Sequence, residues 1–394
     1  MNSKRLKLIA RFKIVTQYGL AQFTVIVAQL VLSLLVIKTK SSALWGEYVE
    51  LLLWVNLPAI ITHFGNKSYL LKAFSENPAS IYQTWLSSLL TRGLLYAVIV
   101  ATVIWIPLFK PYILFIVIWI FLLYINQSFE ALIIYHRDFK LSLFTEAFRN
   151  TLLIVSTLFC LPFLDLKLLI VLVLIAALLK TISYTSYYFR KFNNLSFTID
   201  FSLLSVMLPF FIPMILGTIR TKVDAYYGTL FFTKADLAQY QIFTSLLGFV
   251  AMGGSYVVNP YLKNFYRASK SLANKLMRQF VKMGIAIAFL ALPIIYIVIT
   301  YVYSFNFSGI SYALGLLFLL PIFLHYILIN DFYKRDKQSQ IAWIIGIFSI
   351  LQIFLGYFFV KNFYIEGALG IKVLGQWLLI ACLLVFRKLQ LKAN

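Results

Sequence analysis

The sequence predicts an all-α polytopic membrane protein with about twelve transmembrane helices in two six-helix bundles related by an internal repeat. Of its 394 residues, 62% are hydrophobic and only 12% are charged, which is too little charge for the surface of a soluble fold of this length. Apolar runs of about 20 residues, long enough to cross a bilayer, recur from end to end. The loops between them are too short to hold a folded domain.

The first helix is expected to stay in the protein. Five basic residues precede an apolar run that continues to Ile37 without a small-residue cleavage site, namely Lys4, Arg5, Lys7, Arg11 and Lys13. A cleavable signal peptide would carry such a site, so the sequence indicates a retained transmembrane helix.

Apolar windows place the remaining helices in order along the chain. In the first half the windows are 14–37, 48–71, 86–108, 112–135, 141–162 and 166–187. Arg92 interrupts the start of the third window, which favours a later start for that helix. In the second half the windows are 206–229, 237–260, 281–303, 308–330, 341–360 and 364–386. The two bundles are therefore expected at 1–190 and 191–394.

Basic residues predict the orientation of the helices. Most Lys and Arg residues fall on the side of the N-terminus, including the run Lys263–Lys282 that we expect to link the eighth and ninth helices. The opposite side holds only Lys38, Lys40, Lys110, Lys167, Lys234 and Lys361. The positive-inside rule then places both termini in the cytoplasm. Topology and anionic headgroups explain the net charge of +22, so anionic membrane lipids are expected partners and nucleic acid is not.

The two halves of the sequence correspond at a shift of 192 residues, the difference between positions 48 and 240. This shift aligns Tyr48 with Tyr240, Ala59 with Ala251 and Leu70 with Leu262, and the apolar windows of the two halves also correspond, with a drift of a few residues in the later windows. Parallel repeats of this kind are common in transporters, where the substrate path lies between the halves.

Arg220, Lys222 and Asp224 form the most informative charged cluster. Because the first helix ends near Ile37, the repeat extends the seventh helix to about Thr229, beyond all three charges. Ionised side chains at membrane depth are costly and usually face a polar cavity. The structural alternative is an ion pair between Arg220 and Asp224, which are four residues apart, with Lys222 reaching the outer interface.

Five basic side chains are candidates for a cationic, substrate-binding cavity. Besides Arg220 and Lys222 they are Lys372, Lys180 and Arg149. Lys180 could instead extend to the cytoplasmic headgroups, and Arg149 could form a surface ion pair with Glu146 three residues earlier.

Three acidic side chains, Asp224, Glu50 and Glu130, are candidates for binding a coupling H+ or Na+ or for pairing with charges. Glu130 could equally pair with His136 or Arg137. The three histidines lack ligand spacing and both cysteines lie in apolar runs, so we expect neither a metal site nor a cofactor. We recognise no catalytic constellation.

The segment from Arg220 to Gly228, followed by Lys234–Tyr240, resembles Wzx-type polysaccharide flippases, in which a basic residue and Asp precede an apolar run with Gly. Trp45–Tyr48 resembles the sister element of the first half, and Asn259–Pro260 fits the end of the eighth helix. The family belongs to the multidrug/oligosaccharidyl-lipid/polysaccharide exporter (MOP) superfamily, whose members share two six-helix bundles. One departure is that the first helix carries only glutamines, so a charged site would be asymmetric between the halves.

This resemblance implies that the protein flips an undecaprenyl-diphosphate-linked oligosaccharide across the bacterial cytoplasmic (inner) membrane by alternating access. The product would be a surface polysaccharide such as the O-antigen of lipopolysaccharide or a capsule, and other polysaccharide-assembly membrane proteins would be its partners. A cation-lined cavity suits a diphosphate, because an exposed anion crosses lipid at a cost of many kcal/mol.

Three other functions are compatible with the sequence. One is a membrane-embedded polysaccharide polymerase or glycosyltransferase, although the short outer loops hold few acidic residues. A second is a small-molecule exporter of the same superfamily, although exporters of cationic drugs favour acidic cavities. The third is a peptidoglycan-precursor flippase, which usually carries extra helices.

Overall fold

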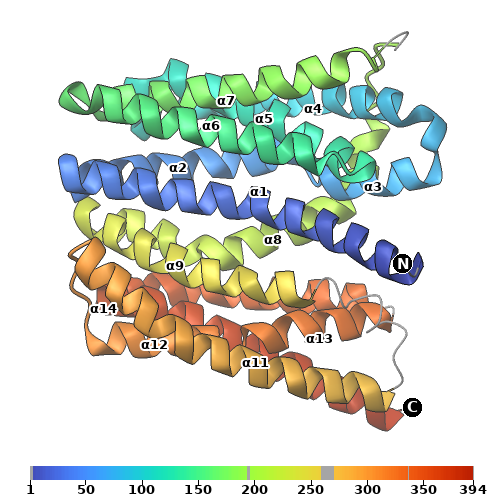
Figure 1. Cartoon of the computed structure of the whole chain (residues 1–394), viewed down its shortest axis with the longest axis vertical. Coiled ribbons are helices and arrows are strands. Elements are labelled where there is room, and N and C mark those ends of the chain that lie inside the picture. Colours follow the sequence, from blue (N-terminus) through green and yellow to red (C-terminus); the bar gives the residue numbers. More distant parts are fainter. Residues whose placement is uncertain (1–2, 193–195, 259–269, 336, 394) are drawn as a thin grey trace. The chain divides into compact units, whose positions relative to one another are not determined.

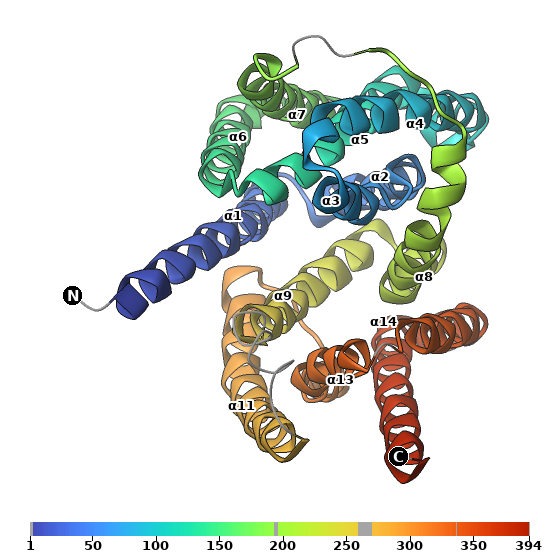
Figure 2. The same ribbon diagram turned by 90° about the vertical axis from the view of Figure 1, so that its right-hand side faces the viewer.

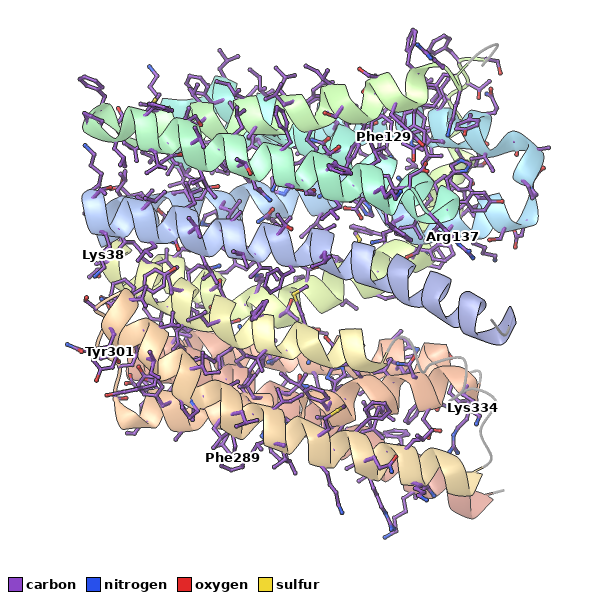
Figure 3. The ribbon with its side chains drawn as sticks, in the orientation of Figure 1. Lys38, Phe129, Arg137, Phe289, Tyr301 and Lys334 are labelled. Carbon is purple, nitrogen blue, oxygen red and sulfur yellow. The ribbon has the colours of Figure 1, made fainter. Side chains whose placement is uncertain are left out.

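The computed structural model describes residues 3–192, 196–258, 270–335 and 337–393. Within these ranges every regular element is a helix, and ten candidates are long and apolar enough to cross a membrane (Figure 1). Many large apolar side chains remain exposed, such as Phe289 on α11, as expected for surfaces that face lipid (Figure 3). The predicted class, an all-α polytopic membrane protein, is confirmed.

The chain divides into two compact units. Unit 1 comprises residues 1–40 and 47–215, and unit 2 comprises residues 41–46 and 216–394. The chain therefore passes between the units inside a helix, because residues 215 and 216 both belong to α8 (Ser202–Phe231). The proposed division of the repeat at residue 190 stays a prediction.

The helices of unit 1 follow the first six predicted windows. They are α1 (Ser3–Thr39), α2 (Ser42–His63), α3 (Asn66–Glu76), α4 (Ile81–Val103), α5 (Ile113–His136), α6 (Phe139–Cys160) and α7 (Leu166–Phe189). Short 3₁₀ turns at Pro78–Ser80, Pro107–Tyr112 and Leu161–Phe163 join neighbouring helices. In this unit α5 packs against α3, α4 and α7, while α6 packs against α1 and α7 (Figure 2).

The second window is broken into α2 and α3, which the apolar pattern does not reveal. Phe64 and Gly65 both have positive φ angles, 46° and 69°. A Cβ on Gly65 would lie 2.7 Å from the backbone nitrogen of Phe211 in α8, and the ring of Phe211 stacks on Phe64 with 4.4 Å between centroids. Glycine is therefore required here both for the backbone angle and for the close approach of α8.

The predicted late start of the third helix is wrong. Its helix, α4, begins at Ile81, and Arg92 lies in its interior with no exposed surface. A charged residue was expected to interrupt the span, but the guanidinium is satisfied by neighbouring helices and so can be buried within the helix.

An extended segment, residues 196–201, follows α7 and is bound to one face of α4. The Gln83 side-chain amide donates to the Ser196 carbonyl (2.7 Å) and accepts from the Ser196 N–H (3.0 Å). The hydroxyls of Thr198 and Ser87 lie 2.6 Å apart, and Thr91 Oγ1 accepts from the Asp200 N–H (3.1 Å). The alternate side chains of this linker are apolar and exposed, namely Phe197, Ile199 and Phe201. Positions 83, 87 and 91 are one turn apart and so form a single row along α4.

Unit 2 contains the C-terminal part of α8 together with α9 (Lys234–Val258), α11 (Lys270–Ile297), α12 (Gly309–Leu319), α13 (Ile322–Lys334) and α14 (Gln338–Ala393), with a π-helical turn at Val298–Val302. The helices α12 and α13 pack against both α11 and α14, and α13 also packs against α9. The tenth window is broken between α12 and α13 at Pro321, which cannot donate a helical hydrogen bond.

The continuous element α14 holds the last two predicted helices. One membrane-span candidate covers Ser339–Leu389, and a straight helix of 51 residues would be about 77 Å long, more than twice the ~30 Å hydrocarbon thickness. Tyr364, at φ 54° and ψ −128°, breaks the helix between the two windows. Its hydroxyl accepts from the Thr233 N–H and donates to Asp236, which fixes the break to the turn between α8 and α9.

The basic run Lys263–Lys282 is only partly a link. Lys270, Lys275, Arg278 and Lys282 lie within α11, because this helix begins earlier than the predicted residue 281. Asn259–Pro260 and Lys263–Ala268 lie outside the described residues.

Labelled residues mark the two ends of each unit, and their positions can be compared with the predicted sides of the membrane. In unit 1, Lys38 lies at the end of the helices opposite to Arg137 (Figure 3). In unit 2, Tyr301 and Lys334 likewise lie at opposite ends (Figure 3). Our assignment also places Lys38 and Arg137 on opposite sides of the membrane, and the identity of the cytoplasmic side stays a prediction.

Candidate functional site

The three charges of the seventh predicted helix lie within a continuous helix. Helix α8 runs to Phe231, so Arg220, Lys222 and Asp224 are interior residues, as the repeat predicted. All three belong to unit 2.

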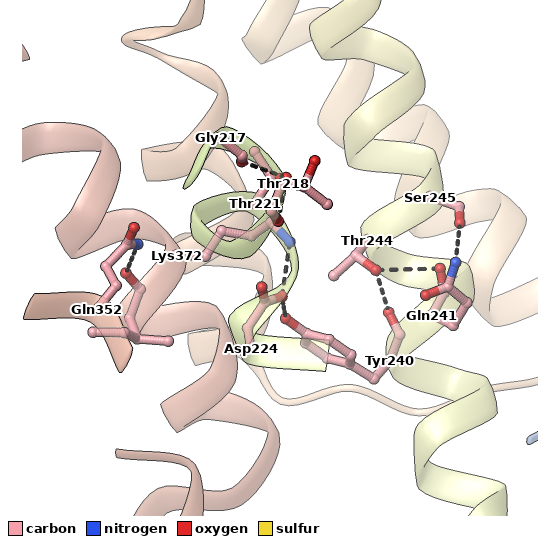
Figure 4. Close-up of polar contacts among 11 residues, drawn as sticks. Gly217, Thr218, Thr221, Asp224, Tyr240, Gln241, Thr244, Ser245, Gln352 and Lys372 are labelled. Atoms are coloured by element: carbon pink, nitrogen blue, oxygen red, sulfur yellow. Dashed lines mark hydrogen bonds and ion pairs between the residues drawn. The ribbon is translucent and has the colours of Figure 1, made fainter. Parts of the chain in front are cut away.

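Asp224 is the centre of a buried polar contact that joins three helices. Its carboxylate, with a side chain only 2% exposed, forms an ion pair with Lys372 of α14, with Nζ and Oδ2 2.7 Å apart (Figure 4). The same oxygen accepts a hydrogen bond from the hydroxyl of Tyr240 on α9 (Figure 4). Asp224 therefore pairs with a residue 148 positions away and not with Arg220 in its own helix.

Arg220 has only a weak contact to the neighbouring helix. Its Nη1 lies 3.5 Å from Oε1 of Gln376, at the limit of a hydrogen bond, and its buried Nε has no partner among the described residues. The Gln376 amide is also 2.6 Å from Nδ1 of His325, so its position is fixed by a second side chain. The Arg220 guanidinium thus keeps most of its hydrogen-bonding capacity for another group.

Lys222 is exposed, and among the described residues no carboxylate forms an ion pair with it. Arg220, Asp224 and Lys372 therefore form a cluster of two cations and one carboxylate. Lys222 adds a third positive charge on the opposite face of α8, because residues two apart on a helix point about 200° apart, so the four residues together carry a surplus of two positive charges. Such a surplus inside a membrane helix favours binding of an anion. No covalent chemistry is required for this.

Hydrogen bonds hold α8 against α14 on both sides of the cluster. The Ser349 hydroxyl donates to the Leu216 carbonyl (3.0 Å), and the Tyr227 hydroxyl donates to the Ile353 carbonyl (2.8 Å). Across the break in α14, the Gln352 amide donates to the Ile371 carbonyl (3.2 Å, Figure 4). These contacts position Arg220 and Asp224 opposite Gln376 and Lys372.

In unit 1, the candidate cations Lys180 and Arg149 share one carboxylate. Glu146 of α6 pairs with Lys180 of α7 at 2.5 Å and with Arg149 at 3.2 Å, and Arg149 also donates to Oδ1 of Asn150 (2.7 Å). The pair between Arg149 and Glu146 was considered as a surface alternative, but both side chains are largely buried. Lys180 points toward this carboxylate, so extension to the headgroups does not describe its position.

The acidic candidates Glu50 and Glu130 also lie in unit 1. Glu130 pairs with Lys67 of α3 at 3.2 Å, and not with the His136 or Arg137 that we considered. His136 contacts the hydroxyl of Tyr82 instead. Glu50 is buried in α2. Within the described ranges, no three His, Cys, Asp or Glu side chains are grouped so that they could hold a metal ion.

Arg92 is a buried cation that is held by uncharged groups. Its guanidinium donates to the Thr62 carbonyl (3.0 Å), Ser128 Oγ (2.8 Å) and Ser88 Oγ (3.4 Å). It also lies 5.2 Å from the ring centroid of Tyr124. These contacts join α2, α4 and α5, so we interpret Arg92 as a structural link within unit 1.

Sequence reasoning missed Tyr240 and Gln376 as members of the charged clusters, and it paired Glu146 with Arg149 but not with Lys180. Tyr240 had one signal in the sequence, because the repeat aligns it with Tyr48. No local motif marks Gln376 or the pair between Glu146 and Lys180, which depend on contacts between helices.

No family model and no curated protein matches this sequence. The chain does resemble solved structures over nearly its whole length. The lipid II flippase MurJ, in an inward-closed conformation, aligns with a TM-score of 0.73 at 16% identity, covering 94% of this chain and 87% of that chain.

Two transporters of the MOP superfamily are also similar. An inward-facing multidrug resistance MATE family transporter has a TM-score of 0.60 at 13% identity, covering 96% of this chain and 95% of that chain. A transporter from Pyrococcus furiosus, reported to have a binding pocket of reverse polarity, has a TM-score of 0.62 at 12% identity and coverages of 97% and 95%. At these identities the likeness shows the fold alone, so the fold implied by the resemblance is confirmed, while membership of the MOP superfamily and the Wzx-type assignment stay predictions.

Proposed function

We propose that this protein flips an undecaprenyl-diphosphate-linked oligosaccharide across the bacterial cytoplasmic membrane, by alternating access, for assembly of a surface polysaccharide. The observation that carries this proposal is the cationic surplus of unit 2. Arg220 and Lys222 lie inside a membrane helix without a carboxylate of their own, and a diphosphate supplies the negative charge that they lack.

The fold supports the same class of function. The similar structures bear the names of a lipid flippase and of multidrug transporters, and the higher of the TM-scores given above belongs to the lipid flippase. The chain covers 87% of that flippase, in keeping with the expectation that a peptidoglycan-precursor flippase has additional helices. We therefore favour a lipid-linked oligosaccharide over the peptidoglycan precursor.

A small-molecule exporter is the second candidate, because the chain covers 95% of a multidrug transporter of the same fold. The basic cluster would then suit an anionic compound and not a cationic drug. We assign the binding role to Arg220, Lys222 and Lys372. We assign a structural role to Lys180 and Arg149, because Glu146 neutralises part of their charge.

Complementation tests the proposal. A bacterial strain that lacks its own O-antigen flippase, but carries the glycan genes of the source strain, would express this protein at matched membrane levels. We expect the wild type to restore surface polymer and the Arg220→Ala/Lys222→Ala variant to reduce it at least tenfold, because each lost charge-assisted contact is worth about 1.5–3 kcal/mol. Lys361→Ala is the matched control, because Lys361 is an exposed lysine of unit 2 outside the cluster.

Two results would contradict the proposal. Full polymer with the double variant would show that substrate does not need the cationic cluster. No polymer with well-expressed wild type, despite a matching glycan, would favour the exporter.

A further inference from the structure

Lys372 differs from Arg220 and Lys222, because it already has a counter-ion. Its Nζ lies 2.7 Å from the nearly fully buried carboxylate of Asp224, while 19% of the lysine side chain is still exposed. An approaching anion can therefore reach the ammonium, whereas the carboxylate behind it is enclosed by protein.

Two neighbouring residue pairs of the cluster join α8 to α14. Arg220 and Asp224 are four residues apart on α8, and Lys372 and Gln376 are four residues apart on α14. Arg220 faces Gln376, and Asp224 faces Lys372, so the helices are antiparallel at this point. The two cations, Arg220 and Lys372, thus belong to successive pairs, which are one helical turn or ~5.4 Å apart along the helices. Two negatively charged groups joined by one bridging atom could contact both.

Tyr240 would keep Asp224 satisfied without the lysine. Its hydroxyl donates to Oδ2 of the carboxylate, and its side chain is fully buried in α9. A buried carboxylate that loses its cation is costly unless hydrogen bonds remain. The phenol supplies such a bond, which lowers the cost of releasing Lys372.

We propose that Asp224 competes with the substrate for Lys372. In the empty site the Asp224 carboxylate pairs with Lys372, and when the substrate binds, its diphosphate displaces that carboxylate and gains Lys372 as a third cationic contact. This inference rests on the proposed function and adds how affinity is set at the same site. An unpaired third cation would be costly in the empty site, so the carboxylate stabilises Lys372 between transport cycles. The same competition weakens binding and so favours release of the transported lipid.

The test measures binding to the purified full-length protein in lipid nanodiscs. The probe is undecaprenyl diphosphate, and its dissociation constant is compared among wild type, Asp224→Asn and Glu146→Gln. We expect Asp224→Asn to bind about tenfold more tightly, because the competing charge is gone. Glu146→Gln is the matched control: it also removes a buried carboxylate that pairs with a lysine, but outside the proposed site. Its stability should fall, so its affinity is measured on the fraction that remains folded and should equal that of the wild type.

Adding Lys372→Gln to Asp224→Asn should abolish the gain, which shows that the gain requires the lysine. Tyr240→Phe gives an independent test in the opposite direction, because it leaves the displaced carboxylate without its donor. We expect this variant to bind severalfold more weakly than the wild type while its thermal unfolding stays cooperative.

The outcomes separate the inference from the function on which it rests. If wild type binds the probe but Asp224→Asn binds equally or more weakly, the competitor role is wrong and the proposed function stands. If Asp224→Asn does not fold, the affinity of Tyr240→Phe decides, and unchanged or tighter binding overturns the inference. If folded wild-type protein does not bind undecaprenyl diphosphate, both proposals fail.

Discussion

Lys180 of α7 and Lys372 of α14 lie in corresponding helices of the internal repeat, the sixth and the twelfth predicted windows. Each forms an ion pair with a buried carboxylate within its own unit, Glu146 in unit 1 and Asp224 in unit 2. The carboxylates come from different helices of the repeat, α6 and α8. The two lysines thus come from corresponding helices, whereas their counter-ions do not.

The surroundings of the two pairs differ in their unsatisfied charge. In unit 1 a second cation, Arg149, shares Glu146, and both cations are held by protein groups. In unit 2 two further cations, Arg220 and Lys222, lie near Asp224 on the same helix without sharing it. Under the proposed function, the comparison teaches that a lysine of the same repeated helix stabilises the fold in one unit and contributes to a binding site in the other.

The largest effect is expected when unit 1 loses its carboxylate. Glu146→Ala leaves Lys180 and Arg149 without a counter-ion in a largely buried site, so the free energy of unfolding should fall by about 3–5 kcal/mol. Thermal unfolding of the protein in detergent measures this loss. A variant with all three charges removed, Glu146→Gln/Arg149→Met/Lys180→Met, should recover much of the stability. An unstable triple variant would show that the charges have a role beyond neutralising one another.

An intermediate effect is expected when Lys372 and Lys180, the lysines of the two corresponding helices, are each replaced by Met. Lys372→Met should lower the rate of polymer export about tenfold, equivalent to about 1.4 kcal/mol, because a substrate contact is lost and Asp224 becomes free to compete for Arg220. Lys180→Met should leave export within about twofold of wild type, because Arg149 still neutralises Glu146. Export rates in the complemented strain, at equal protein levels, test the difference. Equal losses at both lysines would break the comparison and place the unit 1 cluster in the transport path.

The smallest effect concerns a polar contact that we interpret as purely structural. Gln83→Ala removes the two hydrogen bonds to Ser196, each worth about 1 kcal/mol. Residues 196–201 should then exchange their amide hydrogens roughly tenfold or more faster, as measured by mass spectrometry, with unchanged affinity for the substrate lipid. Lys110→Ala, an exposed change elsewhere in unit 1, is the control. A loss of affinity in Gln83→Ala would connect the linker to the binding site.

The helices were predictable because apolar length is a strong local signal, and every predicted window falls on a helix. The breaks were not predictable in the same way. Phe64–Gly65 lies inside the second apolar window, and the gap between the last two windows, which ends at Tyr364, does not reveal that the backbone breaks within one continuous element. The backbone angles at both places are stabilised by contacts with other parts of the chain. Hydropathy does not record such contacts.

The helix that carries the candidate site was predictable, but the ion pairs formed there were not. The repeat correctly extended α8 past Arg220, Lys222 and Asp224. Lys372, the partner of Asp224, is 148 residues away, and Lys180, one of the two partners of Glu146, is 34 residues away, so no rule of local spacing could find these two pairs. The pair between Arg149 and Glu146, three residues apart, was within reach of such a rule. Arg92 was misplaced for a related reason, because the hydroxyl and carbonyl groups that satisfy it come from α2 and α5.

The linker at residues 196–201 has a practical consequence for labelling the protein. The link between the sixth and seventh predicted helices would be an obvious first choice for an epitope tag or a fluorescent reporter. Here alternate residues of the linker are bound to Gln83, Ser87 and Thr91, so an inserted sequence of odd length would turn Phe197 and its apolar neighbours toward this polar row. The exposed start of α12 offers no better position, because the Ser308 hydroxyl accepts from the Ser311 N–H (3.2 Å) and donates to Glu366 (2.8 Å).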